Sequence, residues 1–274
     1  MDIDIEVVCK TASRGVAMLR RFIRIGLACL AWASASVGAQ TPPTVAAASD
    51  LKFALEEVAA QFRRDTGHEL RLVFGSSGHF YAQILQGAPF QMFMSADEDF
   101  VFKLADAGKT RDRGRLYALG RIGILVPQGS PLKADGQLRD VAAALRDGRL
   151  QRFAIANPEH APYGARAKEA LQHAGLWSAL QPHLVYGENI SQAAQFVTSG
   201  AAQAGIVALS LARAPSVARR GQFELIPESW HQPLRQRMVL MKDAPPALEA
   251  FYDYLMRPPA QAIMSRYGFE LPKE

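Results

Sequence analysis

Short apolar segments alternate with amphipathic segments along most of this chain, and the alternation limits the folds that the chain can adopt. The early part shows it three times. "TVAAAS", "LRLVFGSS" and "FQMFMSA" each precede a helical pattern, and these patterns end near residues 65, 85 and 107. In the first of them, Leu55, Val58 and Phe62 recur at helical spacing on one face. A strand–helix order of this kind predicts a doubly wound α/β fold.

A second strand–helix series begins at the apolar segment "RIGILVPQG", residues 121–129. The expected strands in "RFAIANPEH", "HLVYGENI" and "AAQAGIVALS" alternate with helices expected at about 140–147, 164–174 and 191–199. A further strand in "QRMVLMKDA" precedes a final pair of helices. Two successive blocks indicate two similar lobes, and a hydrophobic fraction of 49% suffices for a sizeable core.

The first 39 residues differ from the rest. Arginines at 20, 21 and 24 precede an apolar run over 25–35 and the small residues Val37-Gly38-Ala39, a pattern typical of a secretory signal peptide. We expect synthesis to start at Met18, cleavage near Ala39, and residues 1–17 to be an N-terminal extension. A membrane anchor is the alternative, although the apolar run is shorter than the roughly 20 residues that span a bilayer. The prediction is therefore an exported, soluble, periplasmic protein.

The charge and the metal-ligating residues exclude several classes. The net charge is +5, but five of the 31 basic residues lie in the first 39 positions and the others are dispersed, so we expect no nucleic-acid partner. Cys9 and Cys29 both precede the expected cleavage point, which leaves no disulfide in the exported chain. The six histidines show no metal-ligand spacing, so the sequence predicts no built-in metal site and no cofactor.

The strand-to-helix turns are the expected binding region, because ligands of open α/β sheets lie beyond the carboxyl ends of the strands. Ser49 and Ser77 each follow a strand and small residues at the start of a helix. Each serine alone fits a helix N-cap. Two such turns on neighbouring strands would direct hydroxyl and amide donors into one crevice, which favours an anion. No Lys or Arg lies in these turns, so the donors would be neutral.

Five segments carry a resemblance to a known family. "VAAASDLKFALEEVAAQF", "FGSSGHFYAQILQGAPFQMFMSAD", "IANPEHAPYGARAKEAL", "GENISQAAQFVTSGAAQAGIVALS" and "FYDYLMRPPAQAIMSRYGF" occur in this order over 44–268. Together they resemble the periplasmic molybdate-binding proteins of ABC importers. The resemblance implies a two-lobed, type II periplasmic binding protein of α/β class. Lobe I would comprise 44–121 and 237–274, lobe II would comprise 122–236, and crossing strands near 121–126 and 237–241 would join them.

The resemblance also implies a function and a set of ligand-binding residues. The protein would be a monomer that closes on molybdate or tungstate, with the metal bound as its oxyanion, and would deliver it to an inner-membrane permease. It would not be an enzyme. Ser49 and Ser77 would bind the anion through hydroxyl and backbone N–H, and Tyr163 and Ile190 through backbone N–H. Ser76 is the alternative to Ser77.

Three positions depart from the best-known family pattern or qualify it. Ala208 stands where that branch has a tyrosine, so one phenol donor is missing. The phenol of Tyr163 could replace it from another direction. Asp50 follows Ser49, and we expect its backbone N–H to face the anion while its carboxylate caps the turn or points away; capping without any contact to the anion is the alternative.

Other functions remain open from the residues alone. The same fold could bind sulfate, phosphate or a small organic anion. An exported enzyme acting on anionic substrates is a second alternative, but the sequence positions no base or nucleophile for it. His79, beside the second serine turn, is either an exposed helix residue or a source of positive charge near the anion.

Overall fold

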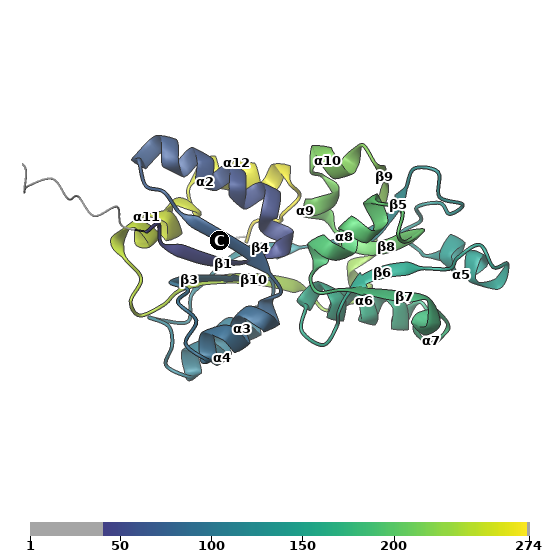
Figure 1. Cartoon of the computed structure of the whole chain (residues 1–274), viewed down its shortest axis with the longest axis horizontal. Helices are drawn as coiled ribbons and strands as arrows, with labels where there is room; N and C mark the ends of the chain where they lie inside the picture. The colour runs from purple at the N-terminus through teal and green to yellow at the C-terminus, as the bar shows by residue number, and fades with distance from the viewer. Residues whose placement is uncertain (1–40, 273–274) are drawn as a thin grey trace, which may run out of the picture. The chain divides into compact units, whose positions relative to one another are not determined.

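The computed structural model describes residues 41–272, and those from Pro42 onward belong to one compact unit (Figure 1). The expected extension over 1–17, the signal peptide, its cleavage near Ala39 and both cysteines lie outside the described residues. No helix among the described residues is both long enough and apolar enough to span a bilayer. The strands of the described residues form two five-stranded sheets, in agreement with the two strand–helix series in the sequence.

The first sheet forms the centre of lobe I and has the strand order β2-β1-β3-β10-β4. Strand β1 is parallel to β2 and β3, whereas β10 is antiparallel to β3 and β4. The sheet is therefore mixed rather than wholly parallel. The strands are β1 (Thr44–Ala48), β2 (Arg71–Gly75), β3 (Met92–Ser95), β4 (Arg115–Gly120) and β10 (Leu234–Leu240).

Helices cover both faces of this sheet because successive strand residues point to opposite sides. In β1, Val45 and Ala47 pack with α2 and the C-terminal helices, whereas Ala46 packs with α3 and α4. Figure 1 shows α2 and α12 on one side of the sheet and α3 and α4 on the other. The helices are η1 (Ser49–Leu51), α2 (Lys52–Thr66), α3 (Ser77–Leu85), α4 (Glu98–Asp106), α11 (Pro246–Tyr254) and α12 (Pro258–Arg266).

The second sheet forms the centre of lobe II and has the strand order β7-β6-β8-β5-β9. Its strands are β5 (Ile122–Pro127), β6 (Phe153–Ala156), β7 (Leu184–Gly187), β8 (Ala204–Ala208) and β9 (Gly221–Leu225). The main helices are α5 (Arg139–Arg146), α6 (Pro162–His173) and α8 (Ile190–Thr198). The short ones are α7 (Trp177–Leu180), η2 (Gln181–His183), α9 (Leu209–Ala212), α10 (Pro215–Ala218) and η3 (Glu228–Trp230).

Two connections cross between the sheets. Arg121 alone separates β4 from β5, and residues 226–233 separate β9 from β10. Strand β10 begins at Leu234, which pairs with Gly120 of the first sheet. Its first three residues therefore belong to the sheet of lobe I, although the sequence had placed the return to lobe I at residue 237. Strands β4 and β9 were not predicted. In β9 the residues are partly or fully exposed, and Gln222 and Glu224 interrupt its apolar residues, so the continuous apolar run of a buried strand is missing.

Candidate functional site

The five residues proposed from the sequence surround one small cavity between the two lobes. Ser49 and Asp50 line it from η1, Ser77 from the start of α3, Tyr163 from the start of α6 and Ile190 from the start of α8. The two serine turns leave the first sheet side by side because Ala48 pairs with Gly75 at the ends of the parallel strands β1 and β2. The sheet topology thus brings together residues that are far apart in the sequence.

The cavity is small. Even with the adjoining open solvent included, the space free of protein atoms is about 190 Å³. Pockets for drug-sized molecules span roughly 300–1,000 Å³. The cavity therefore excludes a large organic ligand.

The hydroxyl groups of Ser49 and Ser77 are arranged in the same way. The Ser49 oxygen accepts a hydrogen bond from the backbone N–H of Ser191 at 3.3 Å, and the Ser77 oxygen accepts one from the N–H of Ala96 at 3.0 Å. Within residues 41–272, neither serine hydrogen has an acceptor. Because each oxygen already accepts an amide, each O–H is left to donate to a guest in the cavity.

Ser76 is engaged differently from Ser77. Its hydroxyl donates to the backbone carbonyl of His160 at 2.5 Å, and its oxygen lies 3.0 Å from Nδ1 of the same histidine. The hydroxyl hydrogen of Ser76 is therefore used in a contact between the lobes. Of the two adjacent serines, the geometry leaves Ser77 with the free donor.

Three helices begin at the cavity. Ser77 and Ile190 are the first residues of α3 and α8, and Tyr163 is the second residue of α6. The first amides of a helix have no partner within the helix, and the helix dipole places partial positive charge there. The described residues that line the cavity include no Lys or Arg. Any anion would therefore be held by neutral hydrogen-bond donors, as the sequence indicated.

The carboxylate of Asp50 is bonded to groups that the sequence did not predict. Its Oδ2 accepts hydrogen bonds from the phenol of Tyr163 at 2.9 Å and from Nε2 of Gln236 at 2.7 Å. The sequence left open whether this side chain caps its turn or points away, and both of these partners lie outside the turn. Tyr163 belongs to lobe II, so this buried bond links the lobes. The Tyr163 hydroxyl hydrogen is thus committed to Asp50, and the suggestion that this phenol serves the anion is wrong for this arrangement.

Burial and hydrogen bonding act in opposite directions on the pKa of Asp50. Burial raises the pKa of Asp50 to about 6, although hydrogen bonds from Gln236 and Tyr163 act in the opposite direction. Its Oδ1 is buried without a hydrogen-bond partner. Burial, followed by the nearby Asp50 charge, raises the pKa of Tyr163 well above its usual value, so Tyr163 stays a neutral donor. The carboxyl group of Asp50 should therefore gain a proton as the pH falls through about 6.

Sequence reasoning missed several residues that support the cavity. Gln236 is fully buried in β10, where it also accepts a hydrogen bond from Tyr117 at 2.7 Å. Ser191 donates to the backbone carbonyl of Ser49, and Ser210 donates to that of Asp50, both at 2.8 Å. A polar glutamine at the start of the apolar segment "QRMVL" was the signal that could have identified Gln236.

Ala208 offers no donor from its strand. It ends β8, is fully buried, pairs with Ile122 and is not among the residues that line the cavity. Among the residues described as lining the cavity, the one phenol is that of Tyr163, and it donates to Asp50. The hydroxyls of Ser49 and Ser77 thus remain the side-chain donors proposed for the anion.

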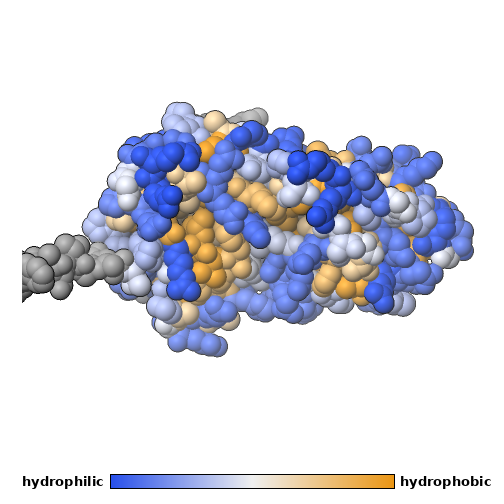
Figure 2. All heavy atoms as spheres, turned by 45° about the horizontal axis from the view of Figure 1, so that its top comes forward, coloured by the Kyte–Doolittle hydropathy of each residue, from blue (hydrophilic) through white to orange (hydrophobic). Residues whose placement is uncertain are grey.

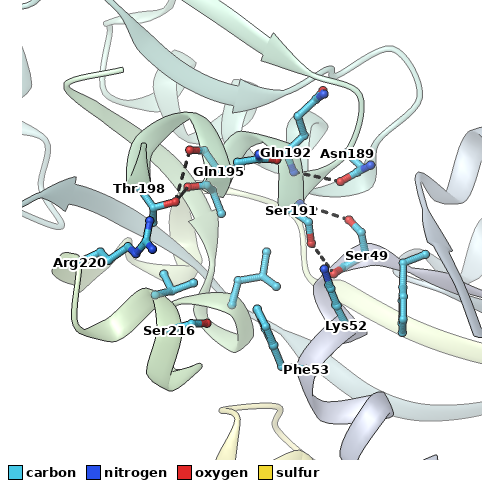
Figure 3. A pocket seen from close by; sticks show the side chains of 14 residues that line it. Ser49, Lys52, Phe53, Asn189, Ser191, Gln192, Gln195, Thr198, Ser216 and Arg220 are labelled. Atoms are coloured by element: carbon cyan, nitrogen blue, oxygen red, sulfur yellow. Dashed lines mark hydrogen bonds between the residues drawn. The ribbon is translucent and has the colours of Figure 1, made fainter. Parts of the chain in front are cut away.

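A larger pocket adjoins the small cavity and shares Ser49 and Asn189 with it. Figure 3 shows Ser49 and Ser191 joined by hydrogen bonds at one side of this pocket, with Lys52 and Arg220 at different parts of its wall. These two cations are outside the lining of the small cavity. They place positive charge where an anion could approach, without placing a cation at the buried site itself.

The chain belongs to the family of bacterial extracellular solute-binding proteins, whose family model matches residues 43–270. This membership and the two mixed sheets confirm the predicted two-lobed α/β binding-protein fold. Among named proteins, the chain is 36% identical over 259 residues to the molybdate-binding protein ModA of Azotobacter vinelandii, covering 93% of this chain and 98% of that protein.

Two further comparisons agree with this assignment. The molybdate-binding protein ModA of Rhodobacter capsulatus is 36% identical over 229 residues, which cover 82% of this chain and 86% of that protein. The solved structure of the Azotobacter vinelandii periplasmic molybdate-binding protein superposes with a TM-score of 0.75 at 31% identity. That match covers 84% of this chain and all of the solved one. These relatives are similar over nearly their whole length.

Proposed function

We propose that this protein is an exported binding protein that captures molybdate or tungstate and delivers it to the permease of an ABC importer. The observation that carries the proposal is the pair of serine hydroxyls, Ser49 and Ser77, each accepting an amide and each left with a hydrogen to donate into one cavity. The family, and the molybdate-binding names of relatives at 36% identity, support the same ligand.

The proposed donors are sufficient for tight binding. The hydroxyls and backbone N–H groups of Ser49 and Ser77, with the helix-start amides of Tyr163 and Ile190, give six hydrogen bonds to an anion. At about 1.5–3 kcal/mol for each bond to a charged group, they supply roughly 9–18 kcal/mol before the costs of desolvation and closure. Neutral donors also leave no unpaired buried cation when the anion departs.

Selectivity would follow from size and from protonation. Donors fixed on the two lobes can all reach a large tetrahedral anion, but a smaller one such as sulfate would leave some of them too distant. Phosphate carries a protonated oxygen near neutral pH, and that hydrogen would meet donors instead of acceptors. The buried carboxylate of Asp50 lines the same cavity, and its negative charge would repel a more highly charged anion more strongly.

Calorimetric titration with molybdate, tungstate, sulfate and phosphate tests the proposal. We expect one anion per chain, with molybdate or tungstate bound at least a hundred times more tightly than sulfate or phosphate. Stronger binding of sulfate would assign the same site to another oxyanion. Turnover of a phosphorylated or carboxylated compound in an activity screen would favour the alternative of an exported enzyme.

Export and the partner are part of the same proposal. We propose that the chain is cleaved near Ala39, acts as a monomer in the periplasm, binds no nucleic acid and docks on an inner-membrane permease. N-terminal sequencing of the protein from a periplasmic extract would test the cleavage point. A mature protein that starts at Met1 or stays with the membrane fraction would contradict it.

A further inference from the structure

Three potential metal ligands meet at the boundary between the lobes, although they are far apart in the sequence. The Nδ1 of His79 and the Nε2 of His160 lie 3.9 Å and 3.7 Å from the same carboxylate oxygen of Glu188. One ligand atom from each of the three residues lies within 4.8 Å of the others. Among residues 41–272 this is the single group of three such side chains placed so closely.

The three residues come from both lobes. His79 is in α3 of lobe I, whereas His160 precedes α6 and Glu188 precedes α8, both in lobe II. The two imidazole rings stack with their centres 3.8 Å apart and an angle of 22° between their planes. Near them, the backbone N–H of Gly78 donates to the carbonyl of His160 at 3.0 Å. The cluster therefore exists only while the two lobes are in contact.

The hydrogen bonds of Ser76 determine which nitrogen of His160 is free. The hydroxyl hydrogen of Ser76 is donated to the carbonyl oxygen of His160, so the Ser76 oxygen can only accept from the ring. The ring therefore carries its hydrogen on Nδ1, and in the neutral imidazole the lone pair is on Nε2. That nitrogen is the one that faces Glu188. A hydrogen bond of this kind to the second nitrogen is the usual support of a metal-binding histidine.

We propose that His79, His160 and Glu188 form a binding site for a divalent transition metal of the Zn²⁺ type, which joins the two lobes beside the anion cavity. Two imidazoles and one carboxylate are the ligands of many zinc sites, whereas Mg²⁺ and Ca²⁺ prefer oxygen alone. In a tetrahedral zinc site with bonds of about 2.0–2.2 Å, neighbouring ligand atoms lie roughly 3.4 Å apart. The distances of 3.7 and 3.9 Å to Glu188, and a spread of up to 4.8 Å within the group, mean that the side chains must move closer together to bind one ion.

Two of the three proposed ligands are open to solvent. Side-chain exposure is 47% for His79 and 66% for Glu188, so an ion can reach the site from solvent, and water can take the fourth position.

The site predicts coupling between the metal and the anion, and this part alone rests on the proposed function. A metal that binds ligands from both lobes stabilises their contact, as does an anion bound by Ser49, Ser77 and Ile190. Each ligand should therefore raise the affinity of the other by the same factor, because coupling between two binding equilibria is reciprocal.

Metal titration of protein that carries no histidine tag tests the site directly. We expect one equivalent of Zn²⁺ per chain by calorimetry, and a Co²⁺ absorption spectrum typical of four ligands. His79→Ala and Glu188→Gln should each weaken Zn²⁺ binding at least tenfold. His68→Ala is the matched control, because His68 is also exposed but lies outside the cluster. Unchanged Zn²⁺ affinity in His79→Ala, or an equal loss in His68→Ala, would overturn the proposal.

A second titration tests the coupling. In the presence of micromolar Zn²⁺, the wild type should bind molybdate several-fold more tightly, and the gain should vanish in His79→Ala. Since Zn²⁺ is also titrated without any anion, failure of the metal site and failure of molybdate binding give different results. Zn²⁺ binding that leaves molybdate affinity unchanged would refute the link between the lobes.

Discussion

Ser77→Ala is the substitution that most directly tests the anion site. It removes the hydroxyl that we assign to the anion, and a hydrogen bond to a charged group contributes about 1.5–3 kcal/mol. We therefore expect anion affinity to fall by about 2 kcal/mol, or roughly thirtyfold. The change also leaves the N–H of Ala96 without its acceptor, so the free energy of unfolding should fall by about 1–3 kcal/mol.

Ser76→Ala is the matched control, since the two serines are adjacent and equally small. The Ser76 hydroxyl already bonds to His160, and a neutral hydrogen bond contributes only about 0.5–1.5 kcal/mol net. Its loss should weaken anion binding less than tenfold, through the contact between the lobes. Calorimetry at 25 °C gives both affinities, and thermal melts give both stabilities. A greater loss of affinity in Ser76→Ala than in Ser77→Ala would refute the assignment.

Three more predictions concern closure and protonation. Gly78→Ala should weaken anion binding by about 1–3 kcal/mol in the same titration. Its new Cβ would lie 2.5 Å from the carbonyl oxygen of His160 in the other lobe, so it would clash only when the lobes are closed. An unchanged affinity would show that the lobes adjust freely. For wild type, anion affinity measured from pH 5 to 8 should fall as the pH rises through about 6, because Asp50 then gains a negative charge beside the anion. Asp50→Asn should remove this pH dependence. The same pH dependence in the variant would assign it to another group. Tyr163→Phe should move the midpoint of that pH dependence upward, because it removes a hydrogen bond that lowers the pKa of Asp50, and an unmoved midpoint would contradict this role.

The sign of the Asp50 effect on stability follows from the same pKa. Between the unfolded value of 3.8 and the folded value of about 6, the folded state binds more protons than the unfolded state. Stability should therefore rise as the pH falls through this window, and the buried charge should lower stability above it. A two-unit difference corresponds to roughly 3 kcal/mol, which is the upper limit for the stability gained by Asp50→Asn at pH 8.

Local sequence determined most of the framework of this protein. Short apolar runs and apolar residues at helical spacing specify strands and helices without reference to distant residues, which is why β1 to β3 and their helices could be predicted. Serines directly after β1 and β2 mark the binding edge, because parallel strands place their carboxyl ends together. Strand β9 has only the short alternation Gln-Phe-Glu-Leu and no continuous apolar run, so that strand was missed.

Tertiary structure decided how the individual groups are paired. The carboxylate of Asp50 meets a phenol 113 positions away, and the hydroxyl of Ser76 meets a carbonyl 84 positions away. These bonds form only when one lobe lies against the other, and no local spacing encodes that placement. The same reason explains why six histidines without ligand spacing still bring His79 and His160 into contact. The sequence by itself specifies the strands and helices and the sheet edge at which the binding turns meet. Packing of the lobes determines which serine hydroxyls are free to donate, that the Asp50 carboxylate is buried, and that His79, His160 and Glu188 come together.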